Sequence, residues 1–446
     1  MSIFDHQRLT NHTLKLNIEG LRQGLYSDKY FENVVRVLSG MHAAAYTFAG
    51  KSARPLPADV TNIHTSELSV EAQLFNRRVP FTLVAGVDVA LAMLRHASGY
   101  YEADTYLERW QHLEVEAVED GTITHYDGDT EDVEPVIRIR GQYRDFALLE
   151  TPILGVLTRA SRIATNVYRV LEVSNGKPVL YFPARFDLPE TQALDGYAYQ
   201  IAVKRYNADF GKTMTPAIST DAQGLWWNGR GGGTVPHALI AMFLGDTAET
   251  MVAFARYAAL SVPRIALVDF NNDCVKASID TINAFWPHFR EALETADTQA
   301  QRRWTLYGVR LDTSANMRDV SLPPDSPGGV NAALVHNVRH ALDHAWESWN
   351  VPSELEDAAK DYCHSVRIVV TGGFNRERIQ KFEAAGVPVD VYGVGSSLLR
   401  NDSETNTDYT MDIVRLQLGK EWLDVAKVGR KPNDNPLLQA VNLADL

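Results

Sequence analysis

The sequence predicts an α/β protein, namely an irregular α/β barrel with a flanking α/β domain and a small β-rich unit. Two observations carry this prediction. From about residue 176 onward, short apolar segments alternate with long amphipathic ones, which is the order of parallel strands connected by helices. Each short segment also runs directly into glycine or polar residues. In a barrel, such strand ends converge on the face that carries the functional site.

Composition narrows the class of protein. The 446 residues are 45% hydrophobic, enough for two or three domains with real cores. The net charge of −13 argues against general nucleic-acid binding, which needs basic patches, although a local site for an anionic substrate can still be positive. Two cysteines give no disulfide framework. The chain starts without a signal-peptide pattern and has no membrane-spanning apolar run, so we expect a cytoplasmic protein.

We divide the chain into three parts. Residues 1–148 form the flanking domain, residues 149–400 form the barrel with the active site, and residues 401–446 pack on the flanking domain. Residues 20–110 are expected to be mostly helical, apart from a loop rich in proline and small residues between positions 44 and 66.

The β-rich unit of the flanking domain is predicted near residues 113–143. Val115 and Ala117 alternate with acidic residues, and Ile137 and Ile139 alternate with arginines. This period of two is typical of short antiparallel strands, and the glycines between the two runs mark turns. A helix is expected directly after this unit.

The barrel is predicted from five buried strands and the amphipathic helices between them. The strands are expected at Pro178–Phe182, Arg264–Phe270, Leu306–Leu311, Val366–Thr371 and Pro388–Tyr392. The helices are expected at 275–300, 331–349 and 376–385. Polar or glycine residues follow every one of the strands, so the sequence predicts a site at their carboxyl ends.

A histidine at the start of a helix gives the first indication of phosphate chemistry. In Gly231-Gly-Gly-Thr-Val-Pro-His237, Thr234 is suited to cap the helix and Pro236 to its first turn. A helix N-terminus disfavours imidazolium and attracts phosphate oxygens, so neutral His237 suits a nucleophile towards phosphorus. Asp269, at the end of a strand, either holds the other ring nitrogen of this histidine or caps the next helix.

Three further strand ends carry residues suited to a phosphorylated sugar. Arg310 and Asp312 occupy alternating positions of a strand, so both side chains project to the same side. Arginine can bind a phosphate through two hydrogen bonds, and aspartate can accept hydrogen bonds from the hydroxyls of a diol. An isolated pair of this kind, however, is usually a surface salt bridge. The loops with Thr371-Gly372-Gly373 and with Gly393-Val-Gly395-Ser396-Ser open towards helices, where backbone amides can close on an anion. The spacing is that of neither a Rossmann nor a Walker loop.

No protein-bound metal is predicted. His336, His340 and His344 share one face of a predicted helix, but the sequence has no His-Glu-x-x-His motif. Charged residues accompany them, so we interpret this face as solvated.

Several motifs, taken in their order along the chain, resemble those of the nicotinate phosphoribosyltransferases, in particular the archaeal-type branch. The motifs are Tyr26-Ser-Asp28-Lys-Tyr30-Phe31, Glu71-Ala-Gln-Leu-Phe-Asn-Arg-Arg, Glu150-Thr-Pro-Ile-Leu, Gly233-Thr-Val-Pro-His237, Gly308-Val-Arg-Leu-Asp312, Thr371-Gly-Gly-Phe-Asn, Tyr392-Gly-Val-Gly-Ser-Ser and Lys427-Val-Gly-Arg-Lys-Pro. The resemblance covers most of the chain. It implies a homodimer of the type II phosphoribosyltransferase fold, with active sites shared across the interface.

The resemblance also implies an activity and residue roles. Phosphoribosyl would pass from phosphoribosyl pyrophosphate to the nitrogen of nicotinate, with Mg²⁺ on the departing pyrophosphate and with ATP phosphorylating His237. Asp269 would orient His237. Arg310 and Asp312 would hold the ribose phosphate, with the two glycine loops around its 5′-phosphate. The pyridine ring would lie between Phe182 and the partner subunit's Tyr30, and its carboxylate beside Arg185.

Two positions depart from the family pattern. Where two arginines commonly follow the stacking aromatic residue, this chain has Arg185 and then Phe186. Where the family usually reads Gly-Thr-Ser-Asn, this chain reads Ile218-Ser219-Thr220-Asp221. If Asp221 faces the substrate, it repels a carboxylate and favours nicotinamide; if Ser219 or Thr220 faces the ring, nicotinate is accepted.

Three alternatives therefore accompany the nicotinate prediction. They are a nicotinamide-specific enzyme, a catalytically silent paralogue that binds pyridine nucleotide and, less favoured, a quinolinate phosphoribosyltransferase, which needs a strongly basic pocket for two carboxylates and no phosphorylated histidine. The C-terminus lacks the cysteines of the metal knuckle found in some relatives, so we predict no structural zinc.

Overall fold

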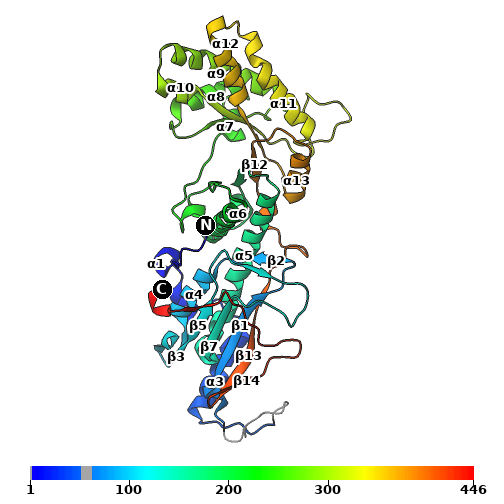
Figure 1. Cartoon of the computed structure of the whole chain (residues 1–446). Helices are drawn as coiled ribbons and strands as arrows, with labels where there is room; N and C mark the ends of the chain where they lie inside the picture. The colour runs from blue at the N-terminus through cyan, green and yellow to red at the C-terminus, as the bar shows by residue number, and fades with distance from the viewer. Residues whose placement is uncertain (1–2, 52–62) are drawn as a thin grey trace.

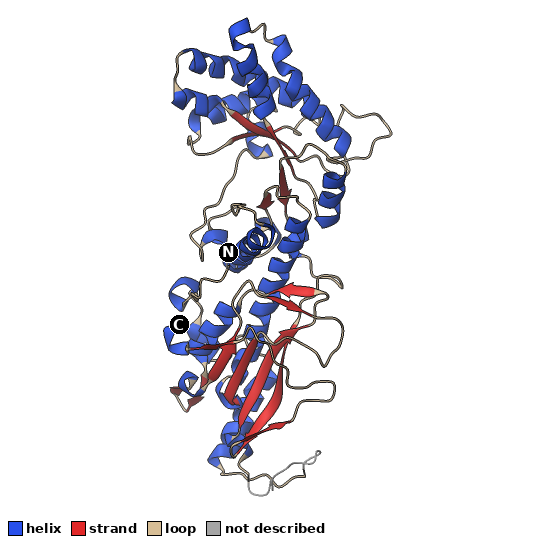
Figure 2. Ribbon diagram, in the orientation of Figure 1, coloured by secondary structure: helices blue, strands red, loops and turns tan. Residues whose placement is uncertain are grey.

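The computed structural model describes residues 3–51 and 63–446 of the chain. The molecule is elongated, with a sheet-rich half at one end and a helix-rich half at the other, as Figures 1 and 2 show. The long helices α5 (Glu150–Glu172) and α6 (Gln192–Phe210) lie between the two halves (Figure 1). In the described parts of the chain, no helix has both the length and the apolar character needed to cross a bilayer.

The sheet-rich half is built on an antiparallel sheet of six strands among the described residues, in the order β14-β13-β1-β7-β5-β15. The strands are β1 (Ser69–Asn76), β5 (Glu114–Ala117), β7 (Ile137–Gln142), β13 (Tyr409–Leu418), β14 (Glu421–Asp424) and β15 (Gln439–Val441). Val70, Ala72 and Leu74 alternate along β1 and pack into the core beneath this sheet. The last three strands come from the C-terminal segment, and β13 pairs with β1 while β15 pairs with β5.

The β-rich unit predicted near 113–143 is confirmed, because β5 and β7 pair antiparallel and β6 (Ile123–His125) pairs with β2 (Phe81–Leu83). The prediction of a mostly helical 20–110 is wrong in part. Helices α2 (Ile18–Arg22), α3 (Lys29–Ala43) and α4 (Val87–Ala97) are present, as is the short α1 (Asn11–Leu14) before them. However, β1, β2, β3 (Gly99–Glu102) and β4 (Thr105–Glu108) also lie in this span.

The error at β1 has a physical cause. This strand pairs on one side with β13, whose residues are about 340 positions later in the chain. Local propensity does not report such a long-range pairing. The alternation of Val70, Ala72 and Leu74 with polar residues was the available strand signal. Residues 52–62 of the loop predicted between 44 and 66 lie outside the described residues.

The helix-rich half contains the five predicted strands in one parallel sheet, although the last of them begins at Val391, three residues after its predicted start. Its described order is β8-β12-β11-β10-β9, with β8 (Val179–Tyr181), β9 (Arg264–Leu267), β10 (Leu306–Leu311), β11 (Arg367–Val370) and β12 (Val391–Val394). Single bridges join Tyr181 to Ile218 and Ile218 to Gly231, which extends the sheet beyond β8. Among the described residues these segments form an open arc of the α/β fold, and no ladder closes it into a ring.

Helices connect and cover these strands. They are α7 (His237–Met242), α8 (Thr247–Tyr257), α9 (Cys274–Glu294), α10 (Thr298–Trp304), α11 (Ala332–His344), α12 (Glu356–Ser365) and α13 (Arg376–Ala384). The helix predicted at 275–300 is two helices, because Asp297 accepts hydrogen bonds from the amides of Gln299 and Ala300 and so starts α10. The helix predicted at 331–349 becomes a 3₁₀ turn after His344.

Candidate active site

The arc of parallel strands encloses a cavity of about 910 Å³. Its wall is formed by strand interiors and by the segments that follow β8, β10, β11 and β12. Most of the predicted site residues line it: Phe182, Arg185, Ser219, Arg310, Asp312, Thr371, Gly372, Gly373, Gly393, Gly395 and Ser396. The predicted convergence of strand ends on one site is therefore present.

Four predicted residues lie outside this lining. His237 and Asp269 form a pair at its edge, three residues beyond Thr234, which does line the cavity. Thr220 turns its hydroxyl away, donating to Gln192 Oε1 at 2.7 Å. Tyr30 lies at the start of α3, near Glu150 at the start of α5, and is 60% exposed. Its action on a partner's site stays a prediction.

His237 and Asp269 make the pairing that the sequence left open. His237 Nε2 lies 2.9 Å from Asp269 Oδ1, and the side chains are 46% and 9% exposed. The alternative role for Asp269 is excluded, because Asp273 caps α9 through the amide of Lys276. Burial raises the pKa of Asp269, while the hydrogen bond and charge of His237 lower it. Since Nε2 is engaged, Nδ1 is the ring nitrogen open to a reaction partner.

The helix that carries His237 differs from the one predicted. Helix α7 begins at His237 itself, with Pro236 at the N-cap position and no side-chain cap, so the expectation that Thr234 is the cap is wrong. Thr234 lies further back and lines the cavity instead. His237 is nevertheless the first residue of a helix, as expected, although α7 spans only six residues.

Arg310 and Asp312 both line the cavity, as their alternation predicted. Arg310 is half-buried; its Nη2 makes a long contact of 3.4 Å to the carbonyl of Val235, and its buried Nε has no hydrogen-bond partner among the described residues. Burial lowers the pKa of Arg310, and the carboxylates of Asp312 and Asp269 oppose that effect. A guanidinium with unused donors at a cavity wall is suited to bind an oxyanion.

The glycines of the two loops serve different purposes. Gly372 and Gly373 have φ values of +85° and +73°, which side chains of L-residues rarely adopt. At Gly393, a Cβ atom would lie 2.4 Å from Thr371 Cγ2 and 3.1 Å from the ring of Phe182. At Gly395, a Cβ would lie 2.8 Å from the ring of Phe186. The second loop therefore needs glycine to admit aromatic rings, a requirement that the phosphate interpretation of its sequence did not include.

Gln223 organises the segment that departs from the family pattern. Its buried Oε1 accepts from the amides of Ser219 at 3.0 Å and Thr220 at 3.2 Å. Asp221 Oδ1 accepts from the amide of Gly231 at 2.8 Å. Ser219 thus faces the cavity, whereas Asp221 is exposed and outside its lining. Sequence reasoning missed Gln223, because an isolated glutamine carries no pattern.

Comparisons with known proteins agree with this geometry. A family model described as the N-terminal domain of quinolinate phosphoribosyl transferase matches residues 59–161. Nicotinate phosphoribosyltransferase from Bacillus subtilis (strain 168) is 23% identical over 300 residues, which are 67% of this chain and 49% of that protein. The chain thus spans about half the length of the curated relative that it matches.

Solved structures show the same fold. Nicotinate-nucleotide pyrophosphorylase from Pyrococcus furiosus has a TM-score of 0.62 and 24% identity, covering 96% of this chain and 85% of that one. Human nicotinic acid phosphoribosyltransferase has a TM-score of 0.50 and 17% identity, covering 88% and 75%. The chain therefore shares the overall fold of these phosphoribosyltransferase structures.

Two asparagines of this chain were not among the site residues predicted from the sequence. In the turn after Asp269, Asn271 Nδ2 donates to the carbonyl of Gly245 at 2.9 Å, and Asn272 Nδ2 donates to that of Arg318 at 2.7 Å. The turn that carries Asp269 is thereby tied to the segment after α7 and to the long loop before α11. The only signal was an Asn-Asn pair directly after a strand end.

Proposed function

We propose that this chain is a nicotinate phosphoribosyltransferase of NAD salvage, forming nicotinate mononucleotide and pyrophosphate and coupled to ATP hydrolysis through a phosphohistidine. The observation that carries the proposal is the His237–Asp269 pair at the edge of a cavity where Arg310, Asp312 and two glycine loops meet. The curated relative in Bacillus subtilis and the human structural neighbour carry matching names, which supports the same activity.

The phosphoribosyl group would occupy the floor of the cavity. Its 5′-phosphate would accept hydrogen bonds at the Thr371–Gly373 and Gly395–Ser396 loops, and Asp312 would accept from the ribose hydroxyls. The bond between the anomeric carbon and the pyrophosphate oxygen breaks as a bond to the pyridine nitrogen forms. The oxocarbenium-like transition state needs positioning and a stabilised leaving group more than covalent help, so Arg310 neutralises phosphate charge. Mg²⁺, when bound, supplies neutralisation of the departing pyrophosphate.

The pyridine ring would stack on Phe182, with the partner subunit's Tyr30 on its other face and Arg185 beside the carboxylate. Phe182 and Arg185 both line the cavity. The hydrogen bond from Gly231 to Asp221 supports nicotinate over nicotinamide, because it keeps that negative charge out of the lining. The cationic side chains in the lining are Arg185, Arg310 and Arg400 among the described residues, and Arg310 is assigned to phosphate. That leaves little for the second carboxylate of quinolinate.

Energy coupling would use the free ring nitrogen of His237. Nδ1 attacks the γ-phosphorus of ATP, a nitrogen–phosphorus bond forms, and the bond to the oxygen of ADP breaks. Asp269 Oδ1 would accept a hydrogen bond from the protonated Nε2 of His237, 2.9 Å away. This hydrogen bond would favour the tautomer in which Nδ1 holds the lone pair. Water later hydrolyses the phosphohistidine, releasing phosphate. His237 itself does not line the cavity, whereas Thr234, three residues earlier, does.

Turnover of phosphoribosyl pyrophosphate tests the proposal. Nicotinate, nicotinamide and quinolinate are each supplied with and without Mg-ATP, and pyrophosphate release is measured. We expect activity on nicotinate that rises with ATP. Activity on nicotinamide alone would mean that Asp221 turns to the substrate, and no activity on any of the three would indicate a silent paralogue.

A further inference from the structure

A second, smaller cavity of about 110 Å³ lies beside the first. The two cavities share Asn375, Ser397 and Arg400 and no other lining residue. The rest of the smaller cavity comes from the loop after β1, from α5, from the start of α13 and from the segment after residue 400: Arg78, Asn166, Arg169, Val170, Arg376, Glu377, Glu404 and Thr405. The volume exceeds the roughly 10–15 Å³ that a single water needs.

Arg78 is the most buried part of this wall, at 4% exposed. It donates through Nη2 to Asn166 at 2.7 Å and through Nη1 to Thr407 at 3.0 Å, while its buried Nε has no partner among the described residues. Burial lowers its pKa to about 10, with the positive charges of Arg169 and Arg162 adding to the effect. This guanidinium is thus held in a position that its neighbours make electrostatically unfavourable.

Arg169 and Arg376 add charge that the described residues do not compensate at close range. Both are half-buried, both have a buried Nε without a partner, and no described carboxylate lies within ion-pair distance of either one. The carboxylates that line the cavity, Glu377 and Glu404, are exposed and form no ion pair among the described residues. Glu172 is near enough to influence both arginines, and Arg400 is already paired with Asp402 at 2.6 Å.

We propose that this cavity binds a free phosphate ion, held by Arg78, Arg169 and Arg376. Guanidinium groups bind tetrahedral oxyanions through paired N–H donors. Arg376 is the first residue of α13, a nine-residue helix, so the amide dipoles at this end add to the attraction. The site is distinct from the proposed 5′-phosphate position, because Arg78, Arg169 and Arg376 do not line the larger cavity. The proposal does not rest on the chemistry assigned there.

A bound phosphate would strengthen the support of the second glycine loop. Asn166, in the same wall, donates to the carbonyls of Leu398 and Arg400, both at 3.1 Å. Leu398 is the next residue after Ser396 and Ser397 of that loop, and Arg400 is two residues further on. An anion between the arginines removes their mutual repulsion and joins α5, α13 and this segment. Phosphate is therefore expected to raise the melting temperature of the protein by linkage.

Calorimetric titration with inorganic phosphate and crystals soaked in selenate test the site in the full chain. We expect an anomalous selenium peak among Arg78, Arg169 and Arg376, and at least tenfold weaker phosphate binding at this site in the variant Arg169→Gln/Arg376→Gln. The matched control is Arg162→Gln, since Arg162 lies on the same helix and is also half-buried but does not line the cavity.

The outcomes separate this proposal from the proposed function. A peak confined to the larger cavity, or equal loss of phosphate binding in Arg162→Gln, would overturn the site whatever the turnover assays give. If the double variant does not fold, the single variant Arg169→Lys is titrated; retaining its charge but not the paired donors, it should bind phosphate more weakly than the wild type. Unchanged affinity in every variant would overturn the assignment.

Discussion

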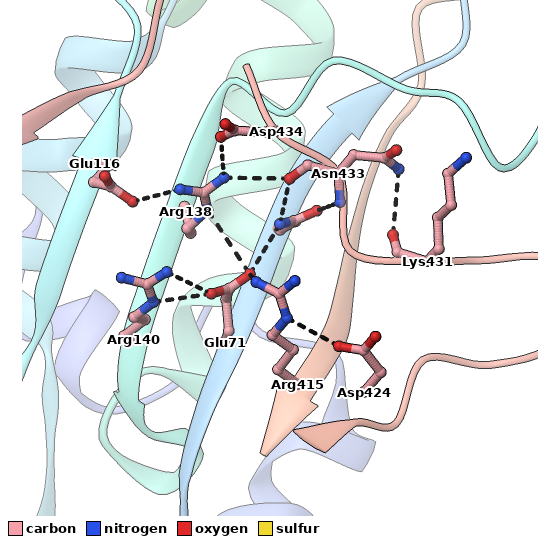
Figure 3. A network of polar contacts seen from close by, with 10 residues as sticks. Glu71, Glu116, Arg138, Arg140, Arg415, Asp424, Lys431, Asn433 and Asp434 are labelled. Carbon is pink, nitrogen blue, oxygen red and sulfur yellow. Dashed lines mark hydrogen bonds and ion pairs between the residues drawn. The ribbon is translucent and has the colours of Figure 1, made fainter. Parts of the chain in front are cut away.

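Two arginine-rich regions of this molecule solve the problem of buried charge in opposite ways. On the antiparallel sheet, fully buried Glu71 is surrounded by Arg138, Arg140 and Arg415 (Figure 3). Arg140 Nη2 lies 2.8 Å from Glu71 Oε2, and the other two reach Oε1 at 3.8 and 3.5 Å. In the cavity, by contrast, Arg310 forms no ion pair among the described residues and makes only a long contact of 3.4 Å to the carbonyl of Val235.

The difference shows how to separate structural arginines from binding ones. Around Glu71, the outer carboxylates complete the network, with Arg138 paired to Glu116 and Asp434 and Arg415 paired to Asp424 (Figure 3). Since these residues come from both the N-terminal and C-terminal strands, the network fastens the ends of the chain together. Arg310, which lines the cavity, has no such carboxylate partner among the described residues. A buried cation that is paired with carboxylates stabilises the fold, whereas one without an ion pair is suited to bind an anion.

The largest expected effect is at His237, the residue that the proposed function makes the phosphoryl acceptor. His237→Ala should abolish ATP hydrolysis and leave slow phosphoribosyl transfer that no longer responds to ATP, because the nitrogen acceptor of the phosphoryl group is removed. Phosphate release from ATP and nucleotide formation are measured in parallel. The control is His336→Ala, because His336 is exposed on α11 and does not line the cavity. Full ATPase activity in His237→Ala would remove the proposed role.

The variant Arg310→Met tests the arginine that has no carboxylate partner. Loss of this cation should lower kcat/KM for phosphoribosyl pyrophosphate by about 10²–10³-fold, the usual effect of removing a donor aimed at developing charge. The melting temperature should not fall, because the guanidinium is buried without full compensation. The matched control is Arg367→Met on the neighbouring strand β11, where the arginine is exposed and rests on Tyr307. A large loss of stability in Arg310→Met would place this residue with the structural arginines.

The variant Glu71→Gln tests the network of paired arginines on the antiparallel sheet. Three arginines would then face a neutral group, so the free energy of unfolding should fall by about 3 kcal/mol, the low end for breaking a buried ion pair. Urea denaturation followed by circular dichroism measures it. Glu116→Gln removes one partially exposed partner of Arg138 and should cost about 1 kcal/mol or less. Equal effects for the two variants would contradict the central place of Glu71 in the network.

The smallest effect is expected at Glu150, a half-buried carboxylate that, unlike Glu71, forms no ion pair with an arginine among the described residues. Burial raises the pKa of Glu150 from 4.5 to about 7, and Tyr143 donates to it at 2.9 Å. The folded state therefore holds the proton more tightly, and this residue's contribution to stability is lost as pH rises from about 4.5 to about 7. Glu150→Gln should remove that loss. The free energy of unfolding of both proteins is measured at pH 4.5 and at pH 8. The same difference between variant and wild type at both pH values would contradict this prediction.

The sequence by itself determined the strands of the parallel sheet and most of the side chains that line the cavity. All five parallel strands follow from apolar runs that end in glycine or polar residues, since burial on both faces leaves a continuous hydrophobic signal. Arg310 and Asp312 face one cavity because the side-chain period of a strand is two. The glycines at 372 and 373 follow from the backbone conformation that their turn requires.

The tertiary structure alone decided which distant residues meet. Strand β1 was misassigned because its pairing with β13 is a contact between opposite ends of the chain, which no local window contains. The sequence left open whether Asp269 caps a helix or binds His237, and the position of α7 in the folded chain decides for His237. The direction of Asp221 depended on the amide of Gly231, ten residues later, and the buried Gln223 became visible only once the segment was folded. Hydrogen bonds of this kind are short in space and unconstrained in sequence, so only the folded chain specifies them.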